Sequence, residues 1–435
     1  MRGHETHPAP LTSHEPLKSE GLRQLVLDAG ADDVGFVDIG RPALDDQRAD
    51  ILRAFPRTKA LISFVVRMNR EPIRSAARSV ANLEFHRGTD GVGEVGHAVV
   101  RALEDRGVAA LNPAPGFPME MDKFPGRTWI VSHKPVAVAA GLGKMGIHRN
   151  VIHPKFGNFV LLGTILVDTA ISDYGQAIDY NPCLECKLCV ASCPVGAISP
   201  NGDFNFSACY THNYREFMGG FSDWAGKIAS SKSALGYRAK VSESESASMW
   251  QSLSFGANYK AAYCLSVCPA GEDVIAPYLD DRKSHVEQHL RPLQAKEETI
   301  YVLKNSDAAD HVAKRFPHKD IKQVENSLHS RTVDGFMQGL GLVFQPGKSV
   351  GIEATYHFSF VGAENRELTV VIRDRKLQIT EGHQGKAELK IRVDTKTWFG
   401  FLAKEKSLVW ALLSRRIRLR GSPKWLLAFG KCFPQ

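Results

Sequence analysis

Seven of the chain's eight cysteines stand at spacings that are typical of iron–sulfur sites. The densest run reads C-L-E-C-K-L-C-V-A-S-C-P and contains Cys183, Cys186, Cys189 and Cys193. Three thiolates spaced in this way on a tight loop can bind three irons of one cubane cluster, and the fourth, on the helix that follows, points away and ligates a second cluster. The run therefore predicts three ligands for one [4Fe-4S] cluster and one ligand for another.

A second cysteine fragment lies downstream. Cys264 and Cys268 form C-x₃-C-P, and Cys209 stands alone between the two fragments. In ferredoxin-type spacing the remote cysteine before proline, here Cys268, joins the first three cysteines of the run. Cys193, Cys209 and Cys264 then remain for the second cluster. The alternatives are a zinc site or scattered structural thiols of the core. Zinc sites usually pair their cysteines as two separated C-x₂-C units, which this pattern fits poorly.

A glycine-rich turn precedes the cysteines. Gly141, Gly143 and Gly146 satisfy G-x-G-x-x-G after an apolar run at 135–141 that is typical of a strand. A nicotinamide site would also need an acidic residue about 20 positions further on, and Asp168 ends a different strand. The glycines therefore favour a tight turn where another large cofactor approaches the backbone.

Polar residues within and after this turn could bond the edge of that cofactor. Lys144, His148 and Asn150 are the candidates, beside the three glycines. Such residues can serve the phosphate or amide groups of a cofactor. The alternative is a helix N-terminus whose polar side chains face water.

Composition is that of an ordinary globular protein. The 435 residues are enough for two or three domains, and 43% of them are hydrophobic. The formal net charge of +8 is spread along the chain, so no nucleic-acid partner is predicted. The N-terminus lacks the order of a signal peptide, and apolar runs such as 159–167 are too short to span a bilayer. A cytoplasmic location, where thiols stay reduced, is expected.

Changes of pattern along the sequence predict an α+β protein with five parts. The expected parts are a disordered leader (1–16), an α/β domain (17–180), a ferredoxin-type module (181–281), a linker (282–324) and a separate α+β domain (325–435). The highly charged start of the linker is typical of a linker or of an exposed helix. In the α/β domain, helices are expected from Leu17 and at 94–107, and strands at 34–39, 59–66, 135–141 and 158–168. In the last domain, period-two alternation predicts antiparallel strands, with a helical segment at 395–415. The serine- and glutamate-rich stretch between Cys209 and Cys264 is typical of a mobile loop, with a lid as the alternative.

Three stretches resemble the family of epoxyqueuosine reductase and the corrinoid-dependent reductive dehalogenases. They read AGLGKMGIHRNVIHPKFGNFVLLGTILVDT (140–169), CLECKLCVASCPVGAI (183–198) and YCLSVCP (263–269). In those reductases the clusters feed single electrons to the cobalt of a cobalamin, which does the chemistry. The resemblance implies a corrinoid cavity with the glycine turn in its wall. Residues 325–435 resemble a sterol-carrier-protein (type 2) lipid-binding domain, through segments such as TYHFSF and WALLSRRIRLRGSP, which implies a hydrophobic ligand.

The chain departs from this family at three places. Where epoxyqueuosine reductase carries a catalytic aspartate in Val-Asp-Ser-x-Pro, residues 131–135 read V-S-H-K-P. The arginine of the dehalogenases is replaced in the run FGNFVLLG, and Ala261 occupies the first cysteine position of the usual second C-x₂-C-x₃-C-P. The second cluster is therefore expected to be [3Fe-4S], or [4Fe-4S] with a non-cysteine ligand.

These observations favour an oxidoreductase that passes single electrons through two clusters to a corrinoid, for reduction of an organic, hydrophobic substrate. A ferredoxin or flavodoxin is the expected electron donor, and no catalytic residue is assigned. The first alternative is an electron relay without its own substrate. The second is a lipid-binding protein with a degenerate reductase fold.

Overall fold

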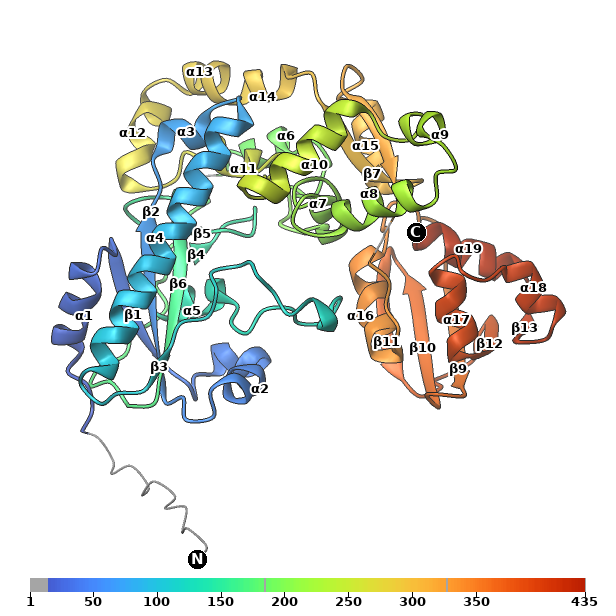
Figure 1. Cartoon of the computed structure of the whole chain (residues 1–435), viewed down its shortest axis with the longest axis horizontal. Helices are drawn as coiled ribbons and strands as arrows, with labels where there is room; N and C mark the ends of the chain where they lie inside the picture. Colours follow the sequence, from blue (N-terminus) through green and yellow to red (C-terminus); the bar gives the residue numbers. More distant parts are fainter. Residues whose placement is uncertain (1–14, 184, 326–327, 435) are drawn as a thin grey trace, which may run out of the picture.

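The computed structural model (Figure 1) describes residues 15–183, 185–325 and 328–434. Of the leader expected at 1–16, residues 1–14 therefore lie outside the described residues. The described part contains a four-stranded sheet, a five-stranded sheet and two smaller pairs of strands. The cysteine-bearing segments lie between the two larger sheets in the sequence.

A four-stranded sheet organises the first part of the chain. Its order is β1-β2-β6-β3, and every neighbouring pair is antiparallel. The strands are β1 (Asp33–Asp38), β2 (Ala60–Arg67), β3 (Ala110–Leu111) and β6 (Val160–Val167). The predicted strands at 34–39, 59–66 and 158–168 are confirmed. An α/β pattern favours a mainly parallel sheet, but the pairing here is antiparallel. The sequence does not distinguish the two arrangements, because a strand covered on both faces is apolar throughout in either kind of sheet.

Helices cover both faces of this sheet (Figure 1). On one face, α1 (Ser19–Asp28) and α4 (Arg78–Glu104) share an apolar core with the strands. On the other face, α2 (Asp45–Ala54) and α5 (His133–Ala139) contribute to a second core. The result is three layers, with the sheet in the middle.

The segment at 135–141, predicted as a strand, forms α5 instead. Val136, Ala137 and Ala139 are buried, and Pro135 lies in the first turn of the helix, where a missing N–H is tolerated. A short run of small apolar residues suits a buried helix and a buried strand equally. The prediction was wrong because no periodicity in this run could decide between them.

The glycine-rich turn after α5 is a β-hairpin. Strand β4 (Lys144–Met145) pairs antiparallel with β5 (Val151–Ile152), shortly before β6 begins. Residues 141–159 are all described and contain no helix. The alternative of a helix N-terminus is therefore wrong, and the helix that a dinucleotide fingerprint opens does not follow this turn.

Three short helices carry cysteines of the predicted cluster sites. They are α6 (Leu188–Ser192) with Cys189, α7 (Phe206–His212) with Cys209, and α11 (Tyr263–Ser266) with Cys264. Lys187 and Ala262, which directly precede α6 and α11, have left-handed backbone conformations. The chain therefore turns sharply just before each of these two helices, which brings the preceding loop close to the helix.

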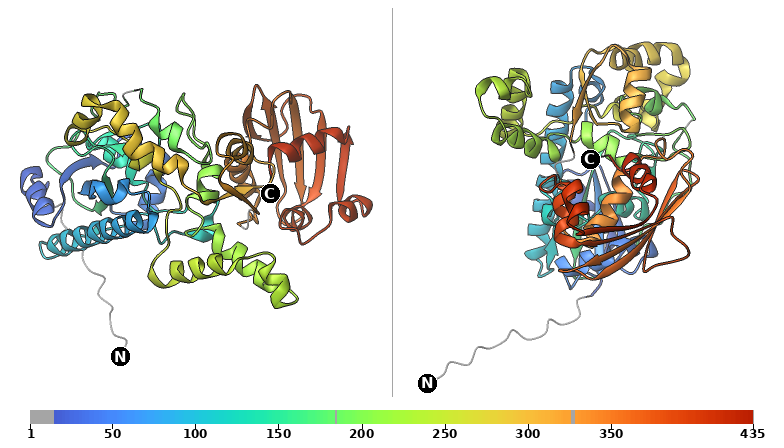
Figure 2. Two further views of the ribbon diagram at one scale, coloured as in Figure 1. Left: turned by 90° about the horizontal axis from the view of Figure 1, so that it is seen from above. Right: turned by 90° about the vertical axis from the view of Figure 1, so that its right-hand side faces the viewer.

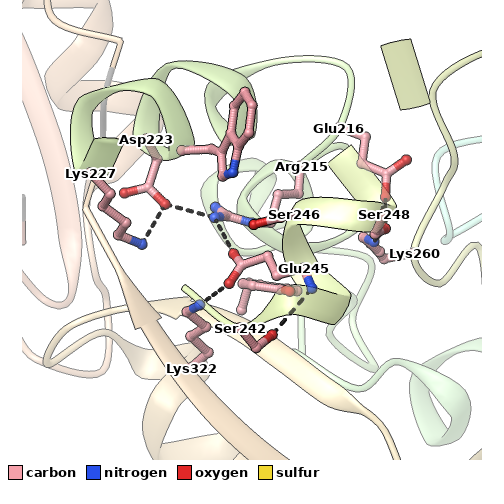
Figure 3. Close-up of polar contacts among 12 residues, drawn as sticks. Arg215, Glu216, Asp223, Lys227, Ser242, Glu245, Ser246, Ser248, Lys260 and Lys322 are labelled. Atoms are coloured by element: carbon pink, nitrogen blue, oxygen red, sulfur yellow. Dashed lines mark hydrogen bonds and ion pairs between the residues drawn. The ribbon is translucent and has the colours of Figure 1, made fainter. Parts of the chain in front are cut away.

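The stretch between Cys209 and Cys264, expected as a mobile loop, contains an arm of helices that projects from the body (Figure 2). They are α8 (Gly219–Ala229), α9 (Ala234–Arg238) and α10 (Glu243–Phe255). Buried Arg215 pairs with Asp223 at 2.6 Å and with Glu245 at 3.3 Å. Glu245 also pairs with Lys322 (Figure 3). The polar composition suggested a solvated loop, but these charged groups bind one another.

Residues 282–324, expected as a linker whose charged start could be an exposed helix, begin with helical turns and fold into packed elements. They are α13 (Arg282–His285), a π-helical turn (Val286–Leu290), α14 (Arg291–Ala295), β7 (Thr299–Leu303), α15 (Asp307–Arg315) and β8 (Asp320–Val324). Strands β7 and β8 pair in parallel on either side of α15. Ile300 and Val312 share an apolar core with Cys189 and Cys193. This segment therefore helps to hold the cysteines in place. Its many charged residues made the apolar residues that face the core hard to recognise in the sequence.

A five-stranded sheet forms the last part of the chain (Figure 2). Its order is β11-β10-β9-β12-β13, with β9 and β12 parallel and the other pairs antiparallel. The elements are α16 (Val333–Val343), β9 (Ala354–Val361), β10 (Arg366–Arg373), β11 (Lys376–Glu381), β12 (Leu389–Asp394), α17 (Thr395–Leu402), α18 (Leu408–Leu413), β13 (Ile417–Gly421) and α19 (Lys424–Cys432). The predicted alternating strands and the helical segment at 395–415 are confirmed. Buried residues of this part, including Trp398, form a core of their own within 333–433.

Candidate functional site

Four of the predicted ligands line one cavity of about 340 Å³. They are Cys183, Cys186, Cys189 and Cys268, which we call the first cysteine set. The cavity lies where the 183–189 loop meets the chain after α11, so residues far apart in sequence form its walls. A cubane cluster takes one thiolate on each of its four irons, and this set supplies four.

Two N–H groups of the glycine turn face the first cysteine set. The Ile147 backbone N–H donates to Cys183 Sγ at 3.4 Å. His148 lines the same cavity, is only 4% exposed, and its Nε2 has no hydrogen-bond partner among the described residues. The Asn150 backbone N–H donates to His148 Nδ1 at 3.1 Å, which assigns the ring proton to Nε2. Burial, with a smaller effect of Lys134, lowers the pKa of His148 to about 4, so the ring is neutral. A buried N–H without an acceptor, beside four thiols, fits a cluster with anionic sulfur.

The second cysteine set consists of Cys193, Cys209 and Cys264. Cys193 is buried in an apolar core, and Cys209 and Cys264 pack against this core. The backbone N–H of Ala197 donates to Cys193 Sγ at 3.3 Å. Cys189 of the first set belongs to the same core. The structure therefore brings the two sets next to each other.

Lys134, which is not among the predicted site residues, lies beside the second cysteine set. Its ammonium donates to the Arg149 carbonyl oxygen at 2.7 Å and to Asn150 Oδ1 at 3.0 Å. Burial lowers the pKa of Lys134, and the thiols of Cys264 and Cys209 act in the opposite direction. Asn150 Nδ2 lies 4.0 Å from Cys264 Sγ. The signal that could have found Lys134 is its position in V-S-H-K-P, where the family carries its catalytic motif.

The position of the usual fourth cysteine of the second set offers no ligating atom. Ala261 is buried, and its backbone N–H donates to Asn213 Oδ1 at 3.0 Å. Asn213 follows α7, whose Cys209 belongs to the second set. Ala261 is therefore held next to that helix and presents only a methyl group.

Burial is the main reason that the thiols are neutral without metal. It raises the pKa of both Cys264 and Cys268 to about 12. The pKa values of Cys189, Cys193 and Cys209 are raised as well, for the same main reason. Since the thiolate is the metal ligand, cluster assembly must release protons.

The glycines of the turn are required by the packing of the chain itself. A Cβ on Gly141 would lie 2.6 Å from the Gln176 carbonyl oxygen, and one on Gly143 would lie 2.5 Å from that of Ile152. A Cβ on Gly146 would contact Ile152 and His148 within 3 Å. The prediction that these glycines leave room for a large cofactor is not supported, because other parts of the chain fill the space. Lys144 pairs with Asp179 at 3.6 Å and is half exposed.

Cluster ligands differ from the ligands of a single metal ion in their spacing. Among the described residues, no three His, Cys, Asp or Glu side chains converge closely enough to share one metal ion. In a cubane cluster each thiolate binds its own iron. The described residues also include no helix long and apolar enough to cross a membrane.

A larger, mainly apolar cavity of about 940 Å³ lies between the last part of the chain and the first. Helices α16, α17 and α19 contribute most of its walls, with Phe124, Pro125 and Tyr210 on the other side. The chain between β3 and α5 reaches toward α16 to close it (Figure 1). Tyr210 directly follows Cys209, and the indole N–H of Trp398 in the wall has no partner among the described residues. Sequence reasoning missed this cavity because its walls come from four distant segments.

Comparison with known proteins supports the prediction that the cysteines bind an iron–sulfur cluster. Residues 177–199 match the family model of the 4Fe-4S binding domain. Over 82 residues the chain is 37% identical to the epoxyqueuosine reductase of Staphylococcus aureus, and the match covers 19% of this chain and 21% of that protein. Across the curated epoxyqueuosine reductases that it matches, the chain spans between 20% and 38% of their length. The chain is thus similar to several reductases over a limited segment, which supports the expectation of a reductive oxidoreductase.

Two solved structures show a weaker likeness. The epoxyqueuosine reductase from Streptococcus thermophilus gives a TM-score of 0.33 at 16% identity, covering 46% of this chain and 57% of that one. A catabolic reductive dehalogenase in complex with 3-bromo-4-hydroxybenzoic acid gives a TM-score of 0.37 at 16% identity, covering 63% of this chain and 37% of that one.

Proposed function

We propose that this chain is an iron–sulfur oxidoreductase that passes single electrons through two clusters to an organic substrate. The observation that carries the proposal is that members of both cysteine sets share one apolar core, with Cys189 of the first set beside the three thiols of the second. Adjacent clusters allow an electron to enter at one and leave from the other. A single-electron donor such as a ferredoxin or flavodoxin would supply them, in a cytoplasm that keeps the thiols reduced. The chain's own residues hold the clusters, exclude water and supply N–H donors to the sulfur.

A corrinoid is the electron acceptor that the family resemblance implies. The residues of the predicted turn do not fit it, because the space at Gly141 and Gly143 is filled by the chain's own backbone. Residues 131–135 also lack the family's aspartate, and His133 is buried, bonded to Thr164 Oγ1 at 2.9 Å. The last redox centre of the proposed path is therefore the second cluster, which would pass the electrons to the substrate. Binding of cobalamin to cluster-replete protein, followed by spectral shift and gel filtration, tests the corrinoid directly.

A hydrophobic substrate is the second part of the proposal. The cavity of about 940 Å³ supports it, since its walls are mainly apolar and Tyr210 places it beside Cys209. The unpartnered indole N–H of Trp398 would suit a ligand with one polar end. The resemblance of 325–435 to a sterol-carrier domain agrees with this chemistry.

The substrate proposal is tested with the full chain and a fluorescent fatty acyl probe. Gly339→Leu would place a side chain in the cavity wall, where only Ser330 and Pro125 lie within 4 Å of a Cβ. We expect saturable binding by the wild type and loss of binding in this variant. Gly341→Leu is the control, because it lies on the same helix and meets nothing within 4 Å. Equal binding by all three proteins would contradict the cavity as the site.

The redox proposal is tested by anaerobic purification with iron, sulfide and cobalt analysis, followed by reduction with dithionite. We expect two clusters that accept electrons and pass them to a hydrophobic acceptor. Full cluster reduction without turnover of any acceptor would instead favour the electron relay. Absence of clusters, with binding of the acyl probe, would favour the lipid-binding alternative.

A further inference from the structure

The second cysteine set supplies too few thiolates for a closed four-iron cluster. Cys193, Cys209 and Cys264 can hold three irons, and the methyl group of Ala261 stands at the family's fourth cysteine position. A fourth iron in such a cluster keeps a coordination position for a ligand from outside the protein. The three-thiolate cluster also carries one negative charge fewer than one held by four thiolates.

Lys134 pairs with no carboxylate among the described residues. Both acceptors of its ammonium, the Arg149 carbonyl oxygen and Asn150 Oδ1, are neutral. In the part of the chain that the structure describes, the groups that interact electrostatically with Lys134 are the thiols of Cys264 and Cys209, the Arg149 guanidinium and the His148 ring. A partly buried ammonium without a carboxylate is costly, and the thiolates of a loaded second cluster together with an anion bound beside them would offset this cost.

The ammonium also retains a donor. Lysine has three N–H bonds, and two of them point to the Arg149 and Asn150 oxygens. Asn150 connects Lys134 to the cluster site, since its Oδ1 accepts from the ammonium and its Nδ2 lies 4.0 Å from Cys264 Sγ. Lys134, Asn150 and Cys264 therefore form one contiguous group, with a free N–H on the lysine.

We infer that the second cluster is a [4Fe-4S] cluster with one open iron, and that this iron binds small anions with Lys134 as their positive partner. The inference rests on the proposed function and narrows it, because it makes the second cluster a ligand-binding centre rather than a relay. Ligands of the class are compact anions with an oxygen, nitrogen or carbon donor, such as a carboxylate, azide or cyanide. Lys134 acts on the bound ligand and is not itself an iron ligand.

Cyanide is a suitable probe, titrated into the full, cluster-reconstituted chain under reducing, anaerobic conditions. The magnetic resonance spectrum of the second cluster should shift and saturate. Lys134→Met should weaken binding about tenfold, the effect of losing one charge-assisted contact, and Lys134→Arg should restore most of it. Lys59→Met is the matched control, because this exposed lysine directly precedes β2 and should leave the affinity unchanged.

Ala261→Cys should close the site. The fourth thiolate would occupy the open iron, abolish the cyanide shift and leave both clusters in place. Brief ferricyanide oxidation gives a second readout that does not depend on cyanide. The wild type should lose one iron and show a [3Fe-4S] signal, whereas Ala261→Cys should keep its iron.

The outcomes separate this inference from the proposed function. Protein without a second cluster by iron analysis would overturn both. Protein with two loaded clusters that shows no cyanide shift and no iron loss on oxidation would overturn the open iron alone. Saturable binding that is unchanged in Lys134→Met would overturn the role of Lys134.

Discussion

The two cysteine sets differ in the groups that would stabilise the negative charge of a bound cluster. The first set has four thiols, and neutral N–H groups from Ile147 and His148 face it. The second set has three thiols, and the ammonium of Lys134 lies beside it. A closed set with neutral donors suits a cluster that only carries electrons. An open set beside a cation suits a cluster that also binds a ligand, and the chain encodes this difference within one module.

Removal of one ligand of the first set is expected to have the largest effect, because it should abolish one cluster and leave the other. Cys186→Ala should lose the first cluster, about half of the roughly eight irons of two four-iron clusters, and leave the second cluster's signal. Cys432→Ala is the control, because Cys432 is buried in the separate core of the last part of the chain. Iron analysis and magnetic resonance of anaerobic protein measure both. Wild-type iron content in Cys186→Ala would show that the first set is not a cluster site.

The arm after Cys209 provides the next largest effect, on stability. Arg215→Met leaves Asp223 and Glu245 without their buried partner, and should lower the local free energy of opening by about 3 kcal/mol. Because the arm begins just after Cys209, the second cluster should become more labile than the first. Hydrogen exchange of 215–260 and the order of iron loss measure this. Arg238→Met removes only an exposed pair with Glu243 at 3.8 Å and should have almost no effect.

Cluster assembly should depend on pH in both sets. The pKa values of Cys268 in the first set and Cys264 in the second are raised to about 12, so these thiols are protonated near neutrality. Each thiolate that binds iron releases a proton, and higher pH therefore favours assembly. Iron uptake by apoprotein should increase from about pH 7 to about pH 9, with measurable proton release. Uptake that is independent of pH would mean that the thiols ionise before iron arrives.

The smallest expected effect is on the potential of the first cluster. His148→Phe removes the Nε2–H that lines the first cavity. Hydrogen bonds to cluster sulfur stabilise the more negative, reduced state, so the variant's reduction potential should fall by an amount on the order of tens of millivolts. Redox titration with magnetic resonance detection separates the two clusters. His97→Phe, on the exposed side of α4, should leave both potentials unchanged, and an equal shift of both clusters would contradict a specific bond.

Local patterns were enough to predict much of the molecule. The cysteine spacing indicated an iron–sulfur module, and the 4Fe-4S family match at 177–199 agrees with it. Alternation in the last part predicted β9 to β13, because each strand buries one face against a core made of its neighbours. Ligand spacing and strand alternation both depend on residues only a few positions apart, so the sequence records them directly.

Other features depend on contacts between distant segments. The run at 135–141 forms a helix whose Val136, Ala137 and Ala139 pack into the core on one face of the sheet, and Gly141 is required by the carbonyl oxygen of Gln176, which is distant in sequence. The charged stretch at 282–324 became part of the cysteine support because its apolar side chains find Cys189 and Cys193.

The sequence by itself determined which cysteines are available, how they divide by spacing, and that Ala261 leaves one position without a thiol. Only the tertiary structure decided that Lys134 stands beside Cys264 and Cys209, and that Tyr210 meets a cavity formed with α16 and α19. The physical reason is the sequence distance between the residues that make each feature. A cluster motif is set by the short reach of the chain between neighbouring cysteines, whereas the charge and the cavity around it are set by whichever segments pack there.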